Sequence, residues 1–175
     1  MSGTQILVVV DMQNDFITGV LGTKEAVAIV PEVEKVLKEF KGLVYFTRDT
    51  HETDYLQTQE GKKLPVEHCI RGTKGWEVCT ELQEYTKGVQ MIDKPTFGST
   101  KLAQMLEEKA KEEEIESITF VGLCTDICVI SNAMLAKATL PEVTIKVIQS
   151  ACAGVTPKTH ENALEAMKVC QIEVI

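Results

Sequence analysis

The sequence lacks any hydrophobic run that approaches the roughly 18 residues typical of a membrane span. It also lacks a block of basic residues, and 26 Asp and Glu against 18 Lys and Arg give a net charge of −8. Nucleic-acid phosphates attract clustered Lys and Arg, and an acidic chain opposes that attraction. We therefore expect neither a membrane nor a nucleic acid among the partners of this protein.

No secretory signal layout precedes the first predicted strand, and no Pro-, Gly- or Ser-rich linker, repeat or low-complexity segment divides the chain. We therefore expect one domain over residues 1–175, located in the cytoplasm. A chain of 175 residues with 44% hydrophobic residues can bury a core without cross-links. The six cysteines are then expected to be reduced thiols: Cys69, Cys79, Cys124, Cys128, Cys152 and Cys170.

Short β-branched runs alternate with amphipathic segments along the chain. The predicted strands cover residues 6–10, 43–47, 89–92, 118–121, 143–148 and 172–175. Helices are expected to begin at Pro31, at Thr100, near Asp126 and near Pro157. This alternation predicts an α/β fold, a three-layer α/β/α arrangement around a six-stranded, mainly parallel sheet. We assume the strand order 3-2-1-4-5-6 of doubly wound sheets.

Three reactive side chains meet at one crevice if the sheet has this order. Asp11 follows the first strand, Lys94 follows the third, and Cys128 lies in the turn from the fourth strand into a helix. A helix start lowers the pKa of a thiol and offers N–H groups to an oxyanion. Cys128 is therefore a candidate nucleophile, with Asp11 as proton acceptor and Lys94 as a cation beside the thiolate. Each residue taken alone is more often a packing, capping or solvated residue.

A second group of candidate ligands lies in the polar stretch 48–75, which is long enough to be either functional or disordered. Asp49 and His51 share one side of an extended segment, and Glu60 and His68 follow in the same stretch. Two imidazoles and two carboxylates suit a divalent transition metal with open coordination positions. Polar loops also contain these residue types without a metal, so spacing alone leaves both interpretations open.

Together these motifs resemble those of the isochorismatase-like cysteine hydrolases. The likeness is carried by the segments 10–16 (VDMQNDF), 94–99 (KPTFGS) and 122–129 (GLCTDICV), and it covers essentially the whole chain. The segment 48–51 (RDTH) with His68 resembles the nicotinamidase (pyrazinamidase) branch. The resemblance implies the fold described above, with Asp11 as general base, Lys94 as electrostatic partner and Cys128 as nucleophile.

The same resemblance implies a substrate pocket and a cofactor. It implies a cis peptide between Leu123 and Cys124, an oxyanion site formed by the amides of Cys124 and Cys128, and a pocket lined by Phe16, Leu123 and Cys124. One divalent transition metal (Zn, Fe or Mn) is expected on Asp49, His51, Glu60 and His68. The implied activity is hydrolysis of nicotinamide to nicotinate and ammonia through a cysteine thioester, a reaction of NAD salvage, in an enzyme that is often a homo-oligomer.

Two alternatives remain at this stage. The chain could be a family member that acts on a ureido, carbamoyl or other small amide without a metal, or a non-catalytic binding protein of the same fold. The aromatic residue common near the second metal histidine is missing, since Leu64 and Pro65 occupy that region and Trp76 lies beyond His68. His160 matches no catalytic position, and we expect it to pack on or cap the last helix.

Overall fold

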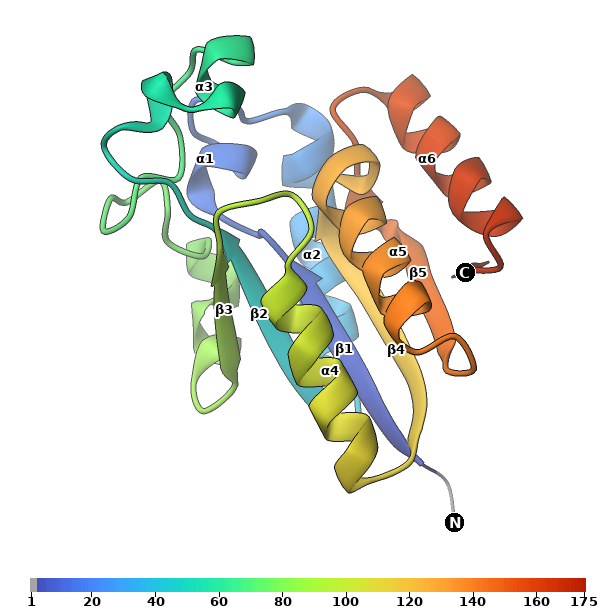
Figure 1. The fold of residues 1–175 in the computed structure, drawn as a ribbon. Helices are drawn as coiled ribbons and strands as arrows, with labels where there is room; N and C mark the ends of the chain where they lie inside the picture. Colours follow the sequence, from blue (N-terminus) through green and yellow to red (C-terminus); the bar gives the residue numbers. More distant parts are fainter. Residues whose placement is uncertain (1–2) are drawn as a thin grey trace.

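The computed structural model describes residues 3–175 and has three layers, with a parallel sheet between two layers of helices (Figure 1). The strand order is β3-β2-β1-β4-β5-β6, and every neighbouring pair is parallel. The strands are β1 (Thr4–Val10), β2 (Leu43–Asp49), β3 (Gln90–Lys94), β4 (Ile115–Leu123), β5 (Thr144–Ala153) and β6 (Glu173–Val174). This topology confirms the predicted fold class and the assumed strand order.

Strand β1 lies at the centre of the sheet, between β2 and β4. Its residues from Ile6 to Val10 have no exposed surface, because helices cover both faces of the sheet. Val10 pairs with Thr47 on β2 and with Gly122 on β4. The carboxyl ends of the three strands therefore meet at one edge, where the predicted reactive residues begin.

Each face of the sheet has its own apolar core. On one face, α2 (Lys24–Glu39) packs with α1 (Asn14–Ile17) and the 3-10 segment η2 (Thr80–Thr86). On the other, α4 (Thr100–Glu112), α5 (Ile130–Thr139) and α6 (Pro157–Val169) cover the sheet (Figure 1). Within residues 3–175, no helix has the length and apolar character of a membrane span.

Helix α2 begins earlier than the sequence predicted. The Thr23 hydroxyl caps it by accepting the N–H of Ala26 at 3.0 Å, and Pro31 lies inside the helix on its exposed side. A proline inside a helix costs about 3 kcal/mol. Burial of Ile29 and Val30, just before the proline, favours the longer helix and offsets this cost. Placing the helix start at Pro31 was therefore wrong.

The stretch 48–75 is ordered by short helices. It contains the 3-10 segment η1 (Tyr55–Gln57) and helix α3 (Gln59–Lys63), and a parallel bridge joins His51 to Ile70. Figure 1 shows α3 beyond the carboxyl ends of the strands. The segment thus forms a cover over the edge of the sheet where β1 and β2 end.

Candidate active site

Asp11, Lys94 and Cys128 lie together at the carboxyl edge of the sheet, as the assumed strand order required. The Lys94 ammonium is 2.7 Å from the Asp11 carboxylate and donates a hydrogen bond of 3.3 Å to the Cys128 sulfur. The three residues are 0%, 1% and 5% exposed, respectively. One buried cation therefore contacts both a candidate base and a candidate nucleophile.

Asp11 occupies a strained turn directly after β1. Its φ of +49° is in the left-handed region, and its N–H donates to the carbonyl oxygen of Thr47 at 3.1 Å. The Thr47 hydroxyl donates to the Asp11 carboxylate at 2.7 Å. Burial raises the pKa of Asp11 above its usual value, although Lys94 opposes this shift. A raised pKa suits a carboxylate that must accept and return a proton near neutral pH.

The thiol of Cys128 differs from the sequence-based expectation. We expected the helix start to lower its pKa, but burial and the neighbouring Asp11 charge raise the pKa well above the usual value, against the effect of Lys94. Cys128 lies inside a π-helical turn, η3 (Thr125–Val129), which leads into α5. The thiol therefore keeps its proton in the resting site, and its ionisation depends on a proton acceptor beside it.

The turn around Cys124 leads from β4 into η3. The Leu123–Cys124 peptide is cis, as the family resemblance implied, and the Cys124 carbonyl accepts the N–H groups of Ile127 and Val129 at 3.1 and 3.0 Å. His160, expected to pack on or cap the last helix, instead places its Nδ1 2.8 Å from the hydroxyl of Thr125. Thr156 and Thr159 form the α6 cap in its place.

Asn132 on α5 anchors the nucleophile turn, and sequence reasoning missed it. Its side-chain amide donates to the carbonyl oxygens of Cys128 at 2.8 Å and Phe97 at 3.1 Å, and its oxygen accepts the N–H of Ser99 at 2.9 Å. The residue is 1% exposed. It thereby joins the turn that carries Cys128 to the loop that follows Lys94.

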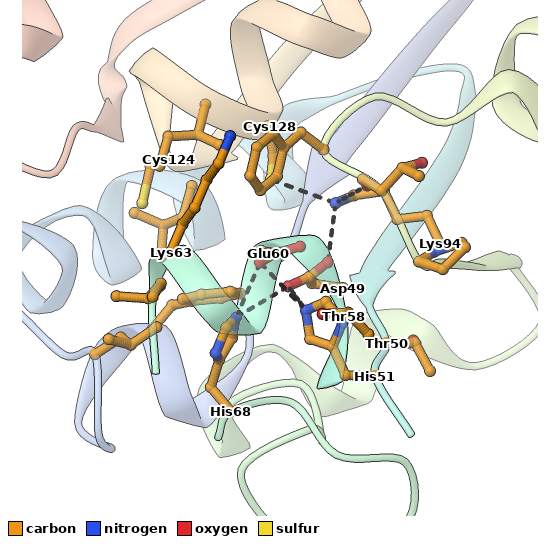
Figure 2. Close-up of a pocket in the computed structure, with 18 of the residues that line it drawn as sticks. Asp49, Thr50, His51, Thr58, Glu60, Lys63, His68, Lys94, Cys124 and Cys128 are labelled. Atoms are coloured by element: carbon orange, nitrogen blue, oxygen red, sulfur yellow. Dashed lines mark hydrogen bonds and ion pairs between the residues drawn. The ribbon is translucent and has the colours of Figure 1, made fainter. Parts of the chain in front are cut away.

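Asp49, His51, Glu60 and His68 form a second cluster next to Lys94 (Figure 2). Asp49 Oδ2 lies 3.0 Å from His51 Nε2 and 3.5 Å from His68 Nε2, and Glu60 lies 3.6 and 3.7 Å from the same two nitrogens. One potential ligand atom from each residue lies within 4.8 Å of the others.

The donor set fits a divalent transition metal. Bond lengths of about 2.0–2.2 Å to nitrogen and oxygen are compatible with ligand atoms this close together. Burial would raise the pKa of Asp49, but hydrogen bonds with His51 and His68 together with the nearby charge of Lys94 lower it below its usual value. His68 Nδ1 lies 2.7 Å from the Val66 carbonyl, so its Nε2 is the ring nitrogen that faces the cluster. Asp49 Oδ1 is buried without a hydrogen-bond partner.

Two aromatic rings pack against the histidines of the cluster. The fully buried Tyr55 ring lies 4.6 Å from the His51 ring and 5.0 Å from the His68 ring, and Phe16 lies 5.6 Å from His68. Tyr55 was not among the predicted site residues; a single aromatic residue in a polar stretch was its only signal. Trp76 lies under the guanidinium of Arg48, 3.7 Å away, and does not line the pocket.

Lys94 and Cys128 line one cavity of about 1050 Å³ together with the four residues of the second cluster. Its lining includes Phe16, Leu123 and Cys124, the three residues expected at a substrate pocket. Three exposed apolar side chains, Leu64, Phe97 and Val155, also line this cavity. The arrangement places a buried thiol, an ammonium and a candidate metal-binding cluster around space for one small organic molecule.

Comparisons with known proteins show which family and which solved structures the chain resembles. The family model described as the isochorismatase domain matches residues 5–175. The nicotinamidase of Schizosaccharomyces pombe is 25% identical over 214 residues, which cover 100% of this chain and 94% of that protein. The pyrazinamidase of Pyrococcus horikoshii in complex with zinc superposes with a TM-score of 0.84, 26% identity and 98% coverage of both chains. The N-carbamoylsarcosine amidase of Thermoplasma acidophilum gives a TM-score of 0.76 and 26% identity, covering 98% of this chain and 95% of that one.

Proposed function

Because the chain belongs to the isochorismatase family, we propose that it is a metal-dependent amidohydrolase that converts nicotinamide to nicotinate and ammonia, a reaction of NAD salvage. The observation that carries the proposal is the position of Lys94 between the two clusters. Its ammonium contacts Asp11 and Cys128 and lies 3.6 Å from Asp49 Oδ1. Relatives named nicotinamidase and pyrazinamidase support this choice of substrate.

Acylation begins with the Cys128 thiol. Asp11 accepts the thiol proton while the sulfur attacks the carboxamide carbon, so that no free thiolate has to persist in the buried site. Burial opposes the positive charge of Lys94, but the nearby carboxylates of Asp11 and Asp49 favour it, and the pKa of Lys94 is raised above its usual value. Lys94 therefore stays protonated and stabilises the negative charge that passes between thiol and carboxylate.

The tetrahedral intermediate carries a negative oxygen, which the backbone amides of Cys124 and Cys128 would hold. Its carbon–nitrogen bond then breaks, and Asp11 returns the proton to the departing nitrogen, which leaves as ammonia. A thioester of nicotinate remains on Cys128. Water attacks this thioester with Asp11 again acting as base, and the products are nicotinate and the restored thiol.

Asp49, His51, Glu60 and His68 would hold one divalent ion, Zn, Fe or Mn. When bound, the ion supplies a Lewis-acidic position for the pyridine nitrogen. Phe16, next to His68, would pack on the ring of the substrate. These contacts would orient the carboxamide toward Cys128, so that binding of the ring would also position the reacting carbon.

The direct test is ammonia release from a substrate panel by metal-free protein, with and without added Zn, Mn or Fe. We expect nicotinamide and pyrazinamide to be hydrolysed only after metal is added. No ammonia from either pyridine or pyrazine amide, under any metal condition, would exclude the proposed substrate class.

A second candidate is hydrolysis of another small amide, such as a carbamoyl or ureido compound. The structural likeness to an N-carbamoylsarcosine amidase and the size of the cavity, about 1050 Å³, favour it. The same panel separates the two, because this candidate predicts ammonia from carbamoyl compounds at a rate that chelation does not change.

A further inference from the structure

Gln13 takes part in no step of the proposed reaction, yet its side chain is fully buried and both its oxygen and its nitrogen form hydrogen bonds. Its Oε1 accepts the N–H of Asp49 at 2.7 Å. Its Nε2 donates to the carbonyl oxygens of Asp49 at 2.8 Å and Trp76 at 2.9 Å. The Gln13 amide therefore binds both main-chain polar groups of Asp49, as a neighbouring strand would.

The hydrogen bonds between Gln13 and Asp49 take the place of strand pairing that ends before Asp49. Strand β1 pairs with β2 only as far as Val10 and Thr47, because the chain turns away at Asp11. Asp49, at the end of β2, pairs with Lys94 of β3 on its other side. Without Gln13, the side of Asp49 that faces β1 would leave a buried N–H and C=O unpaired, which native proteins avoid.

The residue held in this way connects the two halves of the site. Asp49 Oδ2 faces the two histidines of the metal-binding cluster, and Oδ1 lies 3.6 Å from the Lys94 ammonium. Gln13 is also tied to the turn of the proposed base, since its own N–H donates to the Asp11 carbonyl at 2.7 Å. A shift of the Asp49 main chain would therefore move a carboxylate that serves both the metal ligands and the triad.

We propose that Gln13 is a positioning residue that fixes the Asp49 carboxylate and thereby couples the metal centre to the Asp11–Lys94–Cys128 triad. The inference rests on the proposed function, since it assumes that Asp49 binds the metal. Gln13 itself contacts neither the substrate nor the ion. Its effect should appear in metal affinity and in turnover at saturating metal, and a purely structural role would change neither in a protein that remains folded.

The experiment compares Gln13→Met, which keeps the length of the side chain and removes its donor and acceptor, with Gln83→Met. Gln83 is the matched control, because it is an exposed glutamine that donates a hydrogen bond of 3.1 Å to the Val78 carbonyl and not to Asp49. Zinc affinity is measured on metal-free protein by competition with a chelator, and the fold of each variant is checked by circular dichroism. Turnover of nicotinamide is measured at saturating zinc.

We expect Gln13→Met to bind zinc roughly 10- to 100-fold more weakly than the wild type and to show a lower kcat at saturating zinc, while Gln83→Met matches the wild type. If Gln13→Met does not fold, Gln13→Asn serves instead, since it keeps the amide but is too short to span both contacts, and the same weakening is expected. A folded Gln13 variant with wild-type zinc affinity would overturn the inference. A wild type that binds no zinc would instead overturn the proposed metal centre, and the inference with it.

Discussion

The reactivity of the candidate site is determined by the charges that surround two buried residues, Asp11 and Cys128. Burial raises the pKa of both, and Lys94 opposes the rise in each. Both groups also contact the same ammonium, that of Lys94. A thiol and a carboxylate that share one cation suit proton transfer between nucleophile and base, and this arrangement yields two predictions at single residues.

Replacing Thr47 with Val should shift the acid limb of activity to higher pH. The Thr47 hydroxyl donates to the Asp11 carboxylate and lowers its pKa, so the loss of this hydroxyl raises the pKa of Asp11 further. The base is the ionised form, whose fraction grows as pH rises through the pKa, and a higher pKa therefore moves the limb toward alkaline pH. The pH profile of kcat/KM measures this shift.

The control for this variant is Thr119→Val, which changes a buried threonine of β4. Its acid limb should coincide with that of the wild type. An acid limb that stays in place or moves to lower pH in Thr47→Val would contradict the assignment of Asp11 as the base.

Replacing Asp11 with Asn should lower the pKa of the Cys128 thiol, although it abolishes turnover. The Asp11 charge disfavours the thiolate, so its removal allows the thiol to ionise at lower pH. The readout is the pH dependence of iodoacetamide labelling of the Cys128 peptide, measured by mass spectrometry, with the exposed Cys170 as internal reference. In the wild type, Cys128 could show the same pH dependence of labelling as Cys170, and Asp11→Asn could leave it unchanged. Both results together would mean that the Cys128 thiol is unperturbed, and they would support the non-catalytic alternative.

At the level of elements, the close approach of β1 and β4 is what brings the turn of Asp11 next to the turn of Cys124. Gly122 makes this approach possible, because its φ is +117° and a Cβ there would lie 2.2 Å from the Val10 carbonyl oxygen. No other residue type fits that space without separating the strands. Gly122, the first residue of the segment 122–129, is therefore required both by its positive φ and by its packing against β1.

Gly122→Ala should destabilise the protein by more than the roughly 1–3 kcal/mol expected for backbone strain alone. Gly72→Ala is the matched control, since Gly72 also has a positive φ, +80°, but a Cβ there would meet nothing within 4 Å. Urea unfolding of both variants gives the comparison. Equal losses of unfolding free energy would show that the contact with β1 is unimportant.

The elements also show what the sequence could and could not predict. Strands buried on both faces are continuous β-branched runs, and reactive residues directly after them could be assigned to one edge. The start of α2 was misplaced because burial of Ile29 and Val30 outweighs the local preference of Pro31. Tyr55 and Asn132 act through contacts between segments distant in sequence, and those contacts have no local pattern.

For the molecule as a whole, the metal-binding cluster joins the segment 48–75 to the sheet. Asp49 belongs to β2, His51 and His68 flank the helices of the cover, and Glu60 comes from α3. An ion that binds these four residues in the folded state, and not in the unfolded chain, stabilises the whole fold by linkage. The sequence likewise could not show that the pKa of the Cys128 thiol is raised. The main cause is burial of the thiol, which exists only in the folded chain.

Zinc should therefore raise the free energy of unfolding, by about 2.7 kcal/mol at a free concentration 100 times its Kd. His68→Asn should abolish this gain, whereas His160→Asn should keep it, because His160 bonds to Thr125 and lies outside the ligand set. Urea unfolding with and without zinc provides the measurement. An equal gain in His68→Asn and the wild type would mean that zinc binds elsewhere.

The central claim, that Cys128 is the nucleophile of a nicotinamide-hydrolysing enzyme, is tested most directly by the kcat for ammonia release in Cys128→Ala and Cys170→Ala at saturating metal. The two substitutions are chemically identical, but Cys128 is buried beside Lys94 and Cys170 is exposed at the end of α6. We predict a loss of at least about 10⁴-fold for Cys128→Ala and wild-type turnover for Cys170→Ala. Substantial nicotinamide hydrolysis by a pure, folded Cys128→Ala protein would contradict the account.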